Sequence, residues 1–196
     1  MTEVELPNPE ELEERRDKSF SRRVALVTAV YAVVLAIASL GGNNAMKEML
    51  LAQQEASNQW SYYQAKVIRE HLNRGNKMVV EAQLAEPSSI KGAEREKFEA
   101  LAKKFADEEK RMNADKKEIE PKAKAAEAER DRNQTKDPYF DYAEVLLQIA
   151  IVCASVSILS TSRPMFWFSS VLAVLGAVSM INGFLLVFRL PFLHGH

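Results

Sequence analysis

Three long apolar stretches constrain this chain more than any other feature. Residues 24–42, 143–160 and 165–188 contain no Asp, Glu, Lys or Arg except Glu144. An α-helix rises about 1.5 Å per residue, so stretches of this length come close to, or exceed, the roughly 30 Å of a bilayer's hydrocarbon layer. The pattern predicts an all-α integral membrane protein with three transmembrane helices.

The charged residues gather between the first two apolar stretches. The whole chain has 27 acidic and 26 basic residues, and residues 43–140 carry 19 basic and 18 acidic ones. We therefore expect a charged, helical extramembrane domain over residues 43–142, a polar N-terminal tail at 1–23 and a short C-terminal tail at 189–196. Balanced charge provides no basic field for nucleic acid, so no nucleic-acid partner is expected.

The first apolar stretch has an alternative interpretation as a secretory signal. Ser21-Arg22-Arg23 is similar to a twin-arginine start, and Ala36-Ile37-Ala38 is similar to a cleavage site. The charged region in front of it is long and acidic, which favours an uncleaved anchor.

The region after the first span is predicted to be helical. Asn43 or Asn44 caps a new helix, or the membrane helix continues; Gly75 and Asn76 then favour a stop, and residues 86–92 favour a turn. Residues three and four apart form one moderately apolar stripe, predicted to be the packed face. The stripe consists of Met46, Met49, Leu50, Gln53, Ala56, Trp60, Tyr63, Val67 and Leu72.

Residues 93–134 predict a second long helix with half of a heptad seam. Apolar residues recur every seven positions, and Leu101 fills one intermediate position, but the next two, Glu108 and Asp115, are charged. Such a seam suits packing on one neighbouring helix in a coiled-coil-like hairpin. Pro121 predicts a kink in this helix or the first turn of a new helix. Residues 136–138 predict the end of the helical stretch. The seam residues are Phe98, Phe105, Met112, Ile119 and Ala126.

Only residues 161–164 join the second and third spans, which predicts an antiparallel pair in the membrane. Tyr139, Phe140 and Tyr142 precede this pair, and residues 166–168 are aromatic. These aromatic residues are expected at the membrane interface.

The distribution of basic residues indicates an orientation. Five basic residues precede the first span and only Lys47 closely follows it, which favours a cytoplasmic N-terminus in a bacterial inner membrane, with the charged domain periplasmic. Arg130, Arg132 and Lys136 precede the second span on the supposed outer side and weaken this assignment.

Three groups of residues are candidates for interaction, and none forms a catalytic, cofactor or metal motif. His71, His194 and His196 lack ligand spacing, and the single cysteine, Cys153, has no partner. Candidates for protein contact are Trp60, Tyr62, Tyr63, Phe98, Phe105, Met112 and Ile119. Candidates for close packing of membrane helices are Ala32, Ala36, Ala150, Ala154, Ala173, Ala177, Ser179 and Gly183. Polar candidates within the spans are Glu144, Gln148 and Asn182.

The segment 59–66, WSYYQAK preceded by Gln59, carries a family resemblance. Together with residues 44–47 just after the first span, the charged helical region and the two closing spans, it resembles the bacterial membrane family called domain of unknown function 4337. The resemblance covers roughly residues 15–190. It implies three spans with a helical insert, and no site residues.

These features favour a non-enzymatic structural or accessory membrane protein without cofactors. Its expected partners are the lipid bilayer and either further copies of itself or a larger membrane complex. A small channel or transporter subunit that uses the polar residues within the spans is the alternative.

Overall fold

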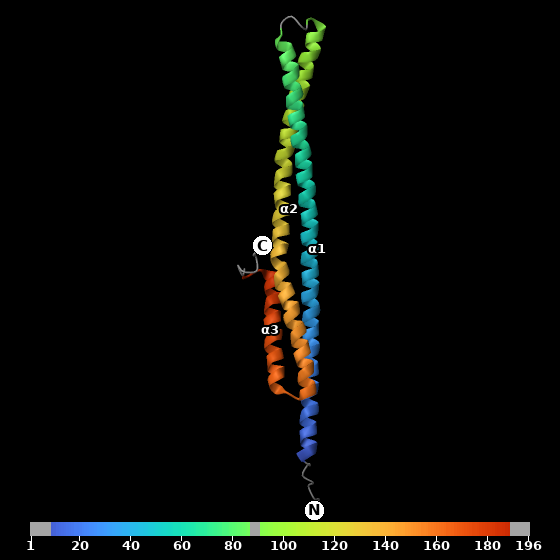
Figure 1. Ribbon diagram of the computed structural model, residues 1–196, viewed down its shortest axis with the longest axis vertical. Helices are drawn as coiled ribbons and strands as arrows, with labels where there is room; N and C mark the ends of the chain where they lie inside the picture. Colours follow the sequence, from blue (N-terminus) through green and yellow to red (C-terminus); the bar gives the residue numbers. More distant parts are fainter. Residues whose placement is uncertain (1–8, 87–90, 189–196) are drawn as a thin grey trace, which may run out of the picture. The chain divides into compact units, whose positions relative to one another are not determined.

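The computed structural model describes residues 9–86 and 91–188, and every regular element among them is an α-helix. The elements are α1 (Pro9–Ala85), α2 (Ala93–Ser160) and α3 (Arg163–Leu185) (Figure 1). Each contains a segment long and apolar enough to cross a membrane. The predicted fold class, an all-α chain with three such helices, is confirmed.

The chain forms two compact units. Unit 1 combines the described residues up to Glu48 with those from Arg132 onward, and unit 2 comprises Met49–Asp131. Unit 1 therefore holds the three apolar segments, and unit 2 holds most of the charged region predicted as a domain.

The helices are longer than the sequence pattern predicts. α1 begins at Pro9 and continues through Asn43, Asn44 and Gly75, so the stop predicted at Gly75 and Asn76 is wrong. α2 continues through Pro121 and Pro138, so the end predicted at residues 136–138 is wrong. A proline inside a helix removes one hydrogen bond and costs about 3 kcal/mol. Packing along a helix of 68 residues outweighs that local cost.

The described part of the turn between α1 and α2 includes a glycine that starts α2. Gly92 has a φ of +65°, and its carbonyl accepts a hydrogen bond from Arg95 N at 3.0 Å. Residues 87–90 of the predicted turn, and residues 189–196 of the predicted tail, lie outside the described residues.

Unit 1 packs many small residues between its helices and presents bulky apolar residues outside. Its interior includes Ala38 from α1, Ala150 and Ala154 from α2, and Ala173 from α3, all at most 4% exposed. Larger side chains point outward: Leu26, Val30, Val33, Leu40, Val152, Val174 and Val178. This arrangement, the reverse of a water-soluble bundle, suits helices that are surrounded by lipid.

One aromatic ring joins all three helices of unit 1. The Phe140 side chain on α2 is 1% exposed and meets the Phe184 ring edge to face, with 4.9 Å between ring centroids. Gly41 and Gly183 leave the space that the ring occupies, because a Cβ on either would lie 2.5 Å or 3.0 Å from it. Phe140 and Tyr139, predicted at the membrane interface, are therefore buried inside unit 1, whereas Tyr142 is exposed.

Short hydrogen bonds tie α2 to α3. Ser169 Oγ donates to the Ala150 carbonyl and Ser179 Oγ donates to the Tyr139 carbonyl, both at 2.7 Å. The paired positions run in opposite directions along the two helices, so the apolar segments of α2 and α3 are antiparallel, as the short connection predicts. In the tight turn between them, Thr161 adopts a left-handed φ of +50°.

Unit 2 consists of parts of α1 and α2 that lie side by side and antiparallel. The cross-helix contacts descend along α2 as they ascend along α1: Trp60 with Glu127, Lys66 with Asp115, and Arg74 with Glu109. Met112 and Ile119 of the half seam are buried, and Phe98 and Phe105 are half-buried. The small residues that complete this core are Ala52, Ala56, Ala123 and Ala126.

Candidate functional site

The packed face of α1 in unit 2 differs from the predicted apolar stripe. Ala56 is buried, and Trp60, Tyr63 and Val67 are half-buried, as expected, but Leu50 and Leu72 are 55% and 62% exposed. Charged side chains occupy the inward positions instead. Ion pairs to α2 satisfy these inward charged side chains. Leu50 and Leu72 lie on the opposite side of α1.

The aromatic residues of the 59–66 segment divide between the two sides of α1. Trp60 and Tyr63 are half-buried and meet edge to face at 5.5 Å, and the Trp60 indole N–H donates to Glu127 Oε1 at 2.8 Å. Tyr62 is 56% exposed, and the Lys66 ammonium lies 5.1 Å from the centre of its ring. Tyr62 is thus available to a partner, whereas Trp60 is engaged within the unit.

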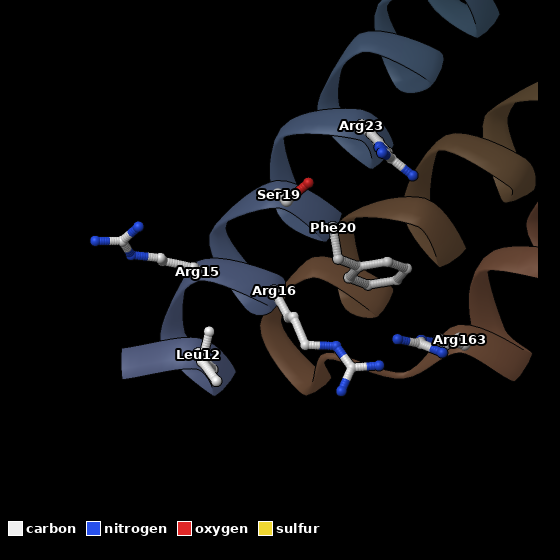
Figure 2. A pocket seen from close by; sticks show the side chains of 7 residues that line it. All are labelled: Leu12, Arg15, Arg16, Ser19, Phe20, Arg23 and Arg163. Carbon is white, nitrogen blue, oxygen red and sulfur yellow. The ribbon is translucent and has the colours of Figure 1, made fainter. Parts of the chain in front are cut away.

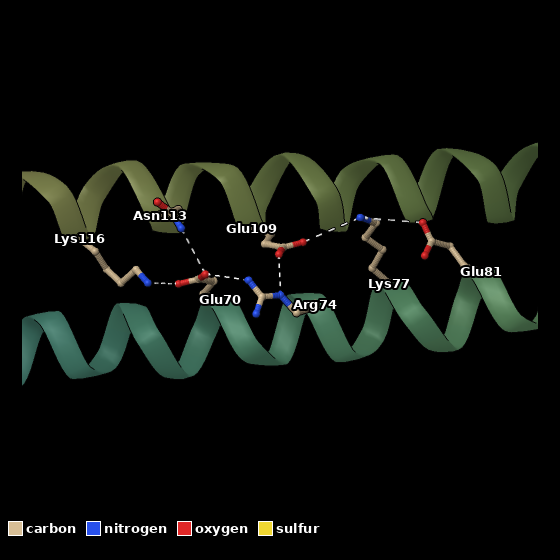
Figure 3. Close-up of polar contacts among 7 residues, drawn as sticks. All are labelled: Glu70, Arg74, Lys77, Glu81, Glu109, Asn113 and Lys116. Carbon is tan, nitrogen blue, oxygen red and sulfur yellow. Dashed lines mark hydrogen bonds and ion pairs between the residues drawn. The ribbon is translucent and has the colours of Figure 1, made fainter.

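Glu70 is the centre of a network of charges between the two helices (Figure 3). Its side chain is 4% exposed, pairs with the Lys116 ammonium on α2, and accepts a hydrogen bond from Arg74 Nη2 at 3.1 Å. Arg74 Nε also donates to Glu109 Oε1 at 2.7 Å, which carries the network back to α2. Lys116, foremost through its hydrogen bond, holds the pKa of Glu70 below its ordinary value of 4.5.

A second ion pair replaces an apolar residue of the seam. Lys66 is 7% exposed, and its ammonium lies 2.6 Å from Asp115 Oδ2, at one of the two charged intermediate heptad positions. Their hydrogen bond raises the pKa of Lys66 above 10.5 and lowers the pKa of Asp115 below 3.8. Unit 2 therefore uses its buried charges to bind its own helices together.

We expect unit 2 to loosen when the solution is acidified. A carboxylate whose folded pKa is lowered contributes full stability above its ordinary pKa, and that contribution is lost as the pH falls through the lowered value. For Glu70 and Asp115 this loss begins below their ordinary values of 4.5 and 3.8. Lys66 has a raised pKa, so its contribution to stability is complete below pH 10.5. That contribution is lost only as the pH rises through the pKa of Lys66 in the folded protein.

The measurement is the fluorescence of Trp60 in a Trp167→Phe protein, where it is the single tryptophan. Its emission should stay constant around neutral pH and change in acid. Asp115→Asn should shift the pH midpoint of this change. Glu118→Gln should leave the midpoint unchanged, because the Glu118 side chain is 74% exposed in its ion pair with Lys122. A transition near neutral pH, or an equal shift from both substitutions, would contradict the assignment.

A long uncharged surface lies on the side of α1 opposite α2. We call it the outer face of α1. Its residues recur three or four positions apart and all are exposed, while the charged residues of this helical segment lie at other positions. The outer face of α1 comprises Leu50, Gln54, Ser57, Ser61, Ala65, Ile68, Leu72, Gly75 and Val79.

The membrane-packing candidates fall into two groups. Ala150, Ala154, Ala173 and Gly183 are buried inside unit 1, and Ala177 and Ser179 are half-buried there. Ala32 and Ala36 are exposed on the outside of unit 1, so they are not buried against the rest of the described chain. Packing between copies stays a prediction for these two alanines.

The three polar residues within the spans do not come together. Gln148 is exposed, whereas Glu144 is half-buried, and no hydrogen bond links any two of the three in the described part of the chain. Asn182 closes the end of its own helix, because its side chain bonds to both the amide and the carbonyl of Phe188 at 2.9 Å and 2.8 Å.

Side chains that could ligate a metal do not cluster in residues 9–86 and 91–188. Within these ranges no three His, Cys, Asp or Glu side chains gather as metal ligands would. His71 is exposed and Cys153 is buried and free, while His194 and His196 lie outside the described residues.

Fold and surfaces together define a class: an all-α protein with three apolar helices of membrane-spanning length and a separate charged helical unit. The chain belongs to the family described as Domain of unknown function (DUF4337), whose model matches residues 20–186. The family predicted from the 59–66 segment is therefore confirmed. No curated protein and no solved structure matches the chain.

Proposed function

We propose that this protein is a non-enzymatic structural or accessory component of a membrane and that it assembles with further copies of itself. Unit 1 would span the bilayer, and unit 2 would supply the contact between copies. The bulky apolar exterior of unit 1 supports the first part, because water would be a poor solvent for it. The buried charged side chains of unit 2, Lys66 and Glu70, form ion pairs between its helices, which supports a structural role.

The outer face of α1 is the observation that carries the assembly. Between its start at Leu50 and its end at Val79 it contains no charged residue, and Ile68 and Leu72 are 67% and 62% exposed near its middle. On the α2 side of unit 2, Leu101 is the only large apolar residue that is exposed among those described. An apolar partner surface therefore matches α1 and not α2.

The composition of the outer face of α1 suits a second copy of the same surface. At a twofold axis each residue near the axis meets its own symmetry mate, so like charges would repel. The polar members here are Gln54, Ser57 and Ser61, whose amide and hydroxyl groups both donate and accept hydrogen bonds. Small residues such as Ser61 and Ala65 also allow two helices to approach closely.

Cysteine cross-linking of the full chain in detergent tests the contact. In a Cys153→Ala background, we expect Ser61→Cys to form a disulfide-linked dimer readily. Ala125→Cys, at an exposed position on α2, should remain largely uncross-linked. Adding Ile68→Lys to Ser61→Cys should reduce the dimer about tenfold, because each copy would bury an unpaired charge.

Light scattering of the unmodified protein provides the second measurement. A monomer at all concentrations, or equal cross-linking from Ser61→Cys and Ala125→Cys, would refute self-assembly through the outer face of α1.

A further inference from the structure

A pocket in unit 1 has a strongly basic lining. It encloses about 640 Å³ and is lined by Leu12, Arg15, Arg16, Ser19, Phe20, Arg23 and Arg163 (Figure 2). We call it the arginine pocket. Four of the seven lining residues are thus arginines, and none of the described lining residues is acidic.

The arginines of this pocket have no anionic partner within the described residues. The nearby ion pair joins Lys18 to Glu14 at 3.0 Å and leaves them uninvolved. All four arginines are exposed, so their charge is available to a ligand. Arginine is the side chain best suited to bind phosphate, because its planar group donates two parallel hydrogen bonds.

Side chains from two helices, α1 and α3, converge in one part of the pocket. In Figure 2 the side chains of Arg16 and Phe20 extend from α1 toward Arg163 at the start of α3, whereas Arg15 points away. Arg163 is the first residue of α3, so the positive end of that helix dipole adds to the same field. Ser162, the cap of α3, makes no side-chain hydrogen bond to the first turn.

The apolar part of the pocket adjoins the membrane-spanning segments. Phe20 packs edge to face on Phe166 of α3, with 6.1 Å between ring centroids. Val24, fully buried, begins the first apolar segment one turn later, and Arg163 lies two residues before the start of the third. A ligand held here would have phosphate-binding groups and apolar surface within the same site.

We propose that the arginine pocket binds the phosphate group of an anionic phospholipid headgroup, with Arg16 and Arg163 as its principal ligands. The lipid's phosphate meets the guanidinium groups, and Phe20, one turn closer to the apolar segments than Arg16, contacts its glycerol and acyl region. Basic pockets at the ends of membrane helices bind acidic lipids through the same combination of charge and apolar surface. This inference rests on the proposed placement of unit 1 in a membrane.

The test is native mass spectrometry of the full chain in mild detergent, titrated with phosphatidylglycerol, phosphatidylcholine or inorganic phosphate. We expect saturable binding of phosphatidylglycerol, at least about tenfold tighter than that of phosphatidylcholine. Arg16→Gln and Arg163→Gln should each weaken it about tenfold. Arg22→Gln removes the same charge from an exposed position outside the pocket and should leave it within about twofold.

Three results would overturn the proposal. An equal loss of phosphatidylglycerol binding in Arg22→Gln would show that a diffuse basic surface, and not a defined site, binds the lipid. Equal binding of the two lipids would exclude recognition of the anionic headgroup. Binding of inorganic phosphate alone, abolished by Arg163→Gln, would exclude the lipid as its source.

Alkaline carbonate extraction of the same variants separates this inference from the proposed function. Release of the unmodified protein from membranes would refute its placement in the bilayer. Retention in the membrane, combined with lipid binding that ignores Arg16 and Arg163, would refute the arginine pocket alone.

Discussion

Phe140→Ala is expected to lower the thermal stability of unit 1 more than any other single truncation within it. The ring contacts all three helices of the unit, and its removal leaves a cavity between Gly41, Gly183 and Phe184. Truncation of a buried phenylalanine costs about 3 to 5 kcal/mol. Circular dichroism of the full chain during heating in mild detergent measures the loss.

The glycine beside this ring provides a sharper form of the same experiment. Gly41→Leu alone should also destabilise unit 1, since a Cβ there would lie 2.5 Å from the Phe140 ring. In the Phe140→Ala protein, however, Gly41→Leu should restore part of the loss by filling the cavity. Tyr142→Ala, at an exposed aromatic residue on the same helix, is the control. Additive losses from Gly41→Leu and Phe140→Ala would contradict the packing described above.

Glu70→Ala is expected to have the largest effect in unit 2. It leaves Lys116, whose side chain is 17% exposed, without its anionic partner and removes one of the two acceptors of Arg74. Loss of one partner of a buried ion pair is strongly destabilising, because the remaining charge stays desolvated. We expect the melting midpoint, followed by Trp60 fluorescence in the Trp167→Phe protein, to fall by at least about 5 °C.

The control for Glu70 is an exposed glutamate of the same unit. Glu118→Ala removes a pair with Lys122 four residues away on one helix, where little stability is at stake. Exchanging the charges, Glu70→Lys with Lys116→Glu, should recover part of the loss, although Arg74 then faces a cation. If Glu70→Ala and Glu118→Ala melted alike, the network between the helices would contribute nothing to the pairing.

The apolar segments were predictable from the sequence because membrane helices follow a simple rule of length and composition. The short connection at 161–164 likewise permits only an antiparallel pair of spans. The ends of the helices were not predictable by local rules. Pro138 and Gly75 are stop signals in isolation, but tertiary packing carries α2 and α1 through them.

The inward face of unit 2 was mispredicted for a related reason. Hydrophobic periodicity counts Leu50 and Leu72 as core and treats Lys66 and Glu70 as solvent-exposed. The structure reverses these roles, because Asp115 and Lys116 on α2 stand opposite the two charged residues. The signal was present in part: Asp115 interrupts the heptad seam where an apolar residue was expected, and its charge required a partner, which Lys66 on α1 supplies.

The arginine pocket could be anticipated only in part. The sequence shows Arg16 and Arg23 as basic residues before the first span. They come close to Arg163 only because α3 packs beside α1. Contacts between residues far apart in sequence, such as Phe20 and Phe166, bring these arginines together. No local pattern encodes it.

The small-inside, bulky-outside arrangement of unit 1 also has a calorimetric consequence. The heat capacity of a soluble domain rises steeply on unfolding because apolar side chains enter water. In a bilayer the outward side chains of unit 1, such as Leu26 and Val174, already face the surrounding solvent in the native state. Separation of its helices within lipid would expose few further apolar groups to water, so the stability of unit 1 should vary almost linearly with temperature.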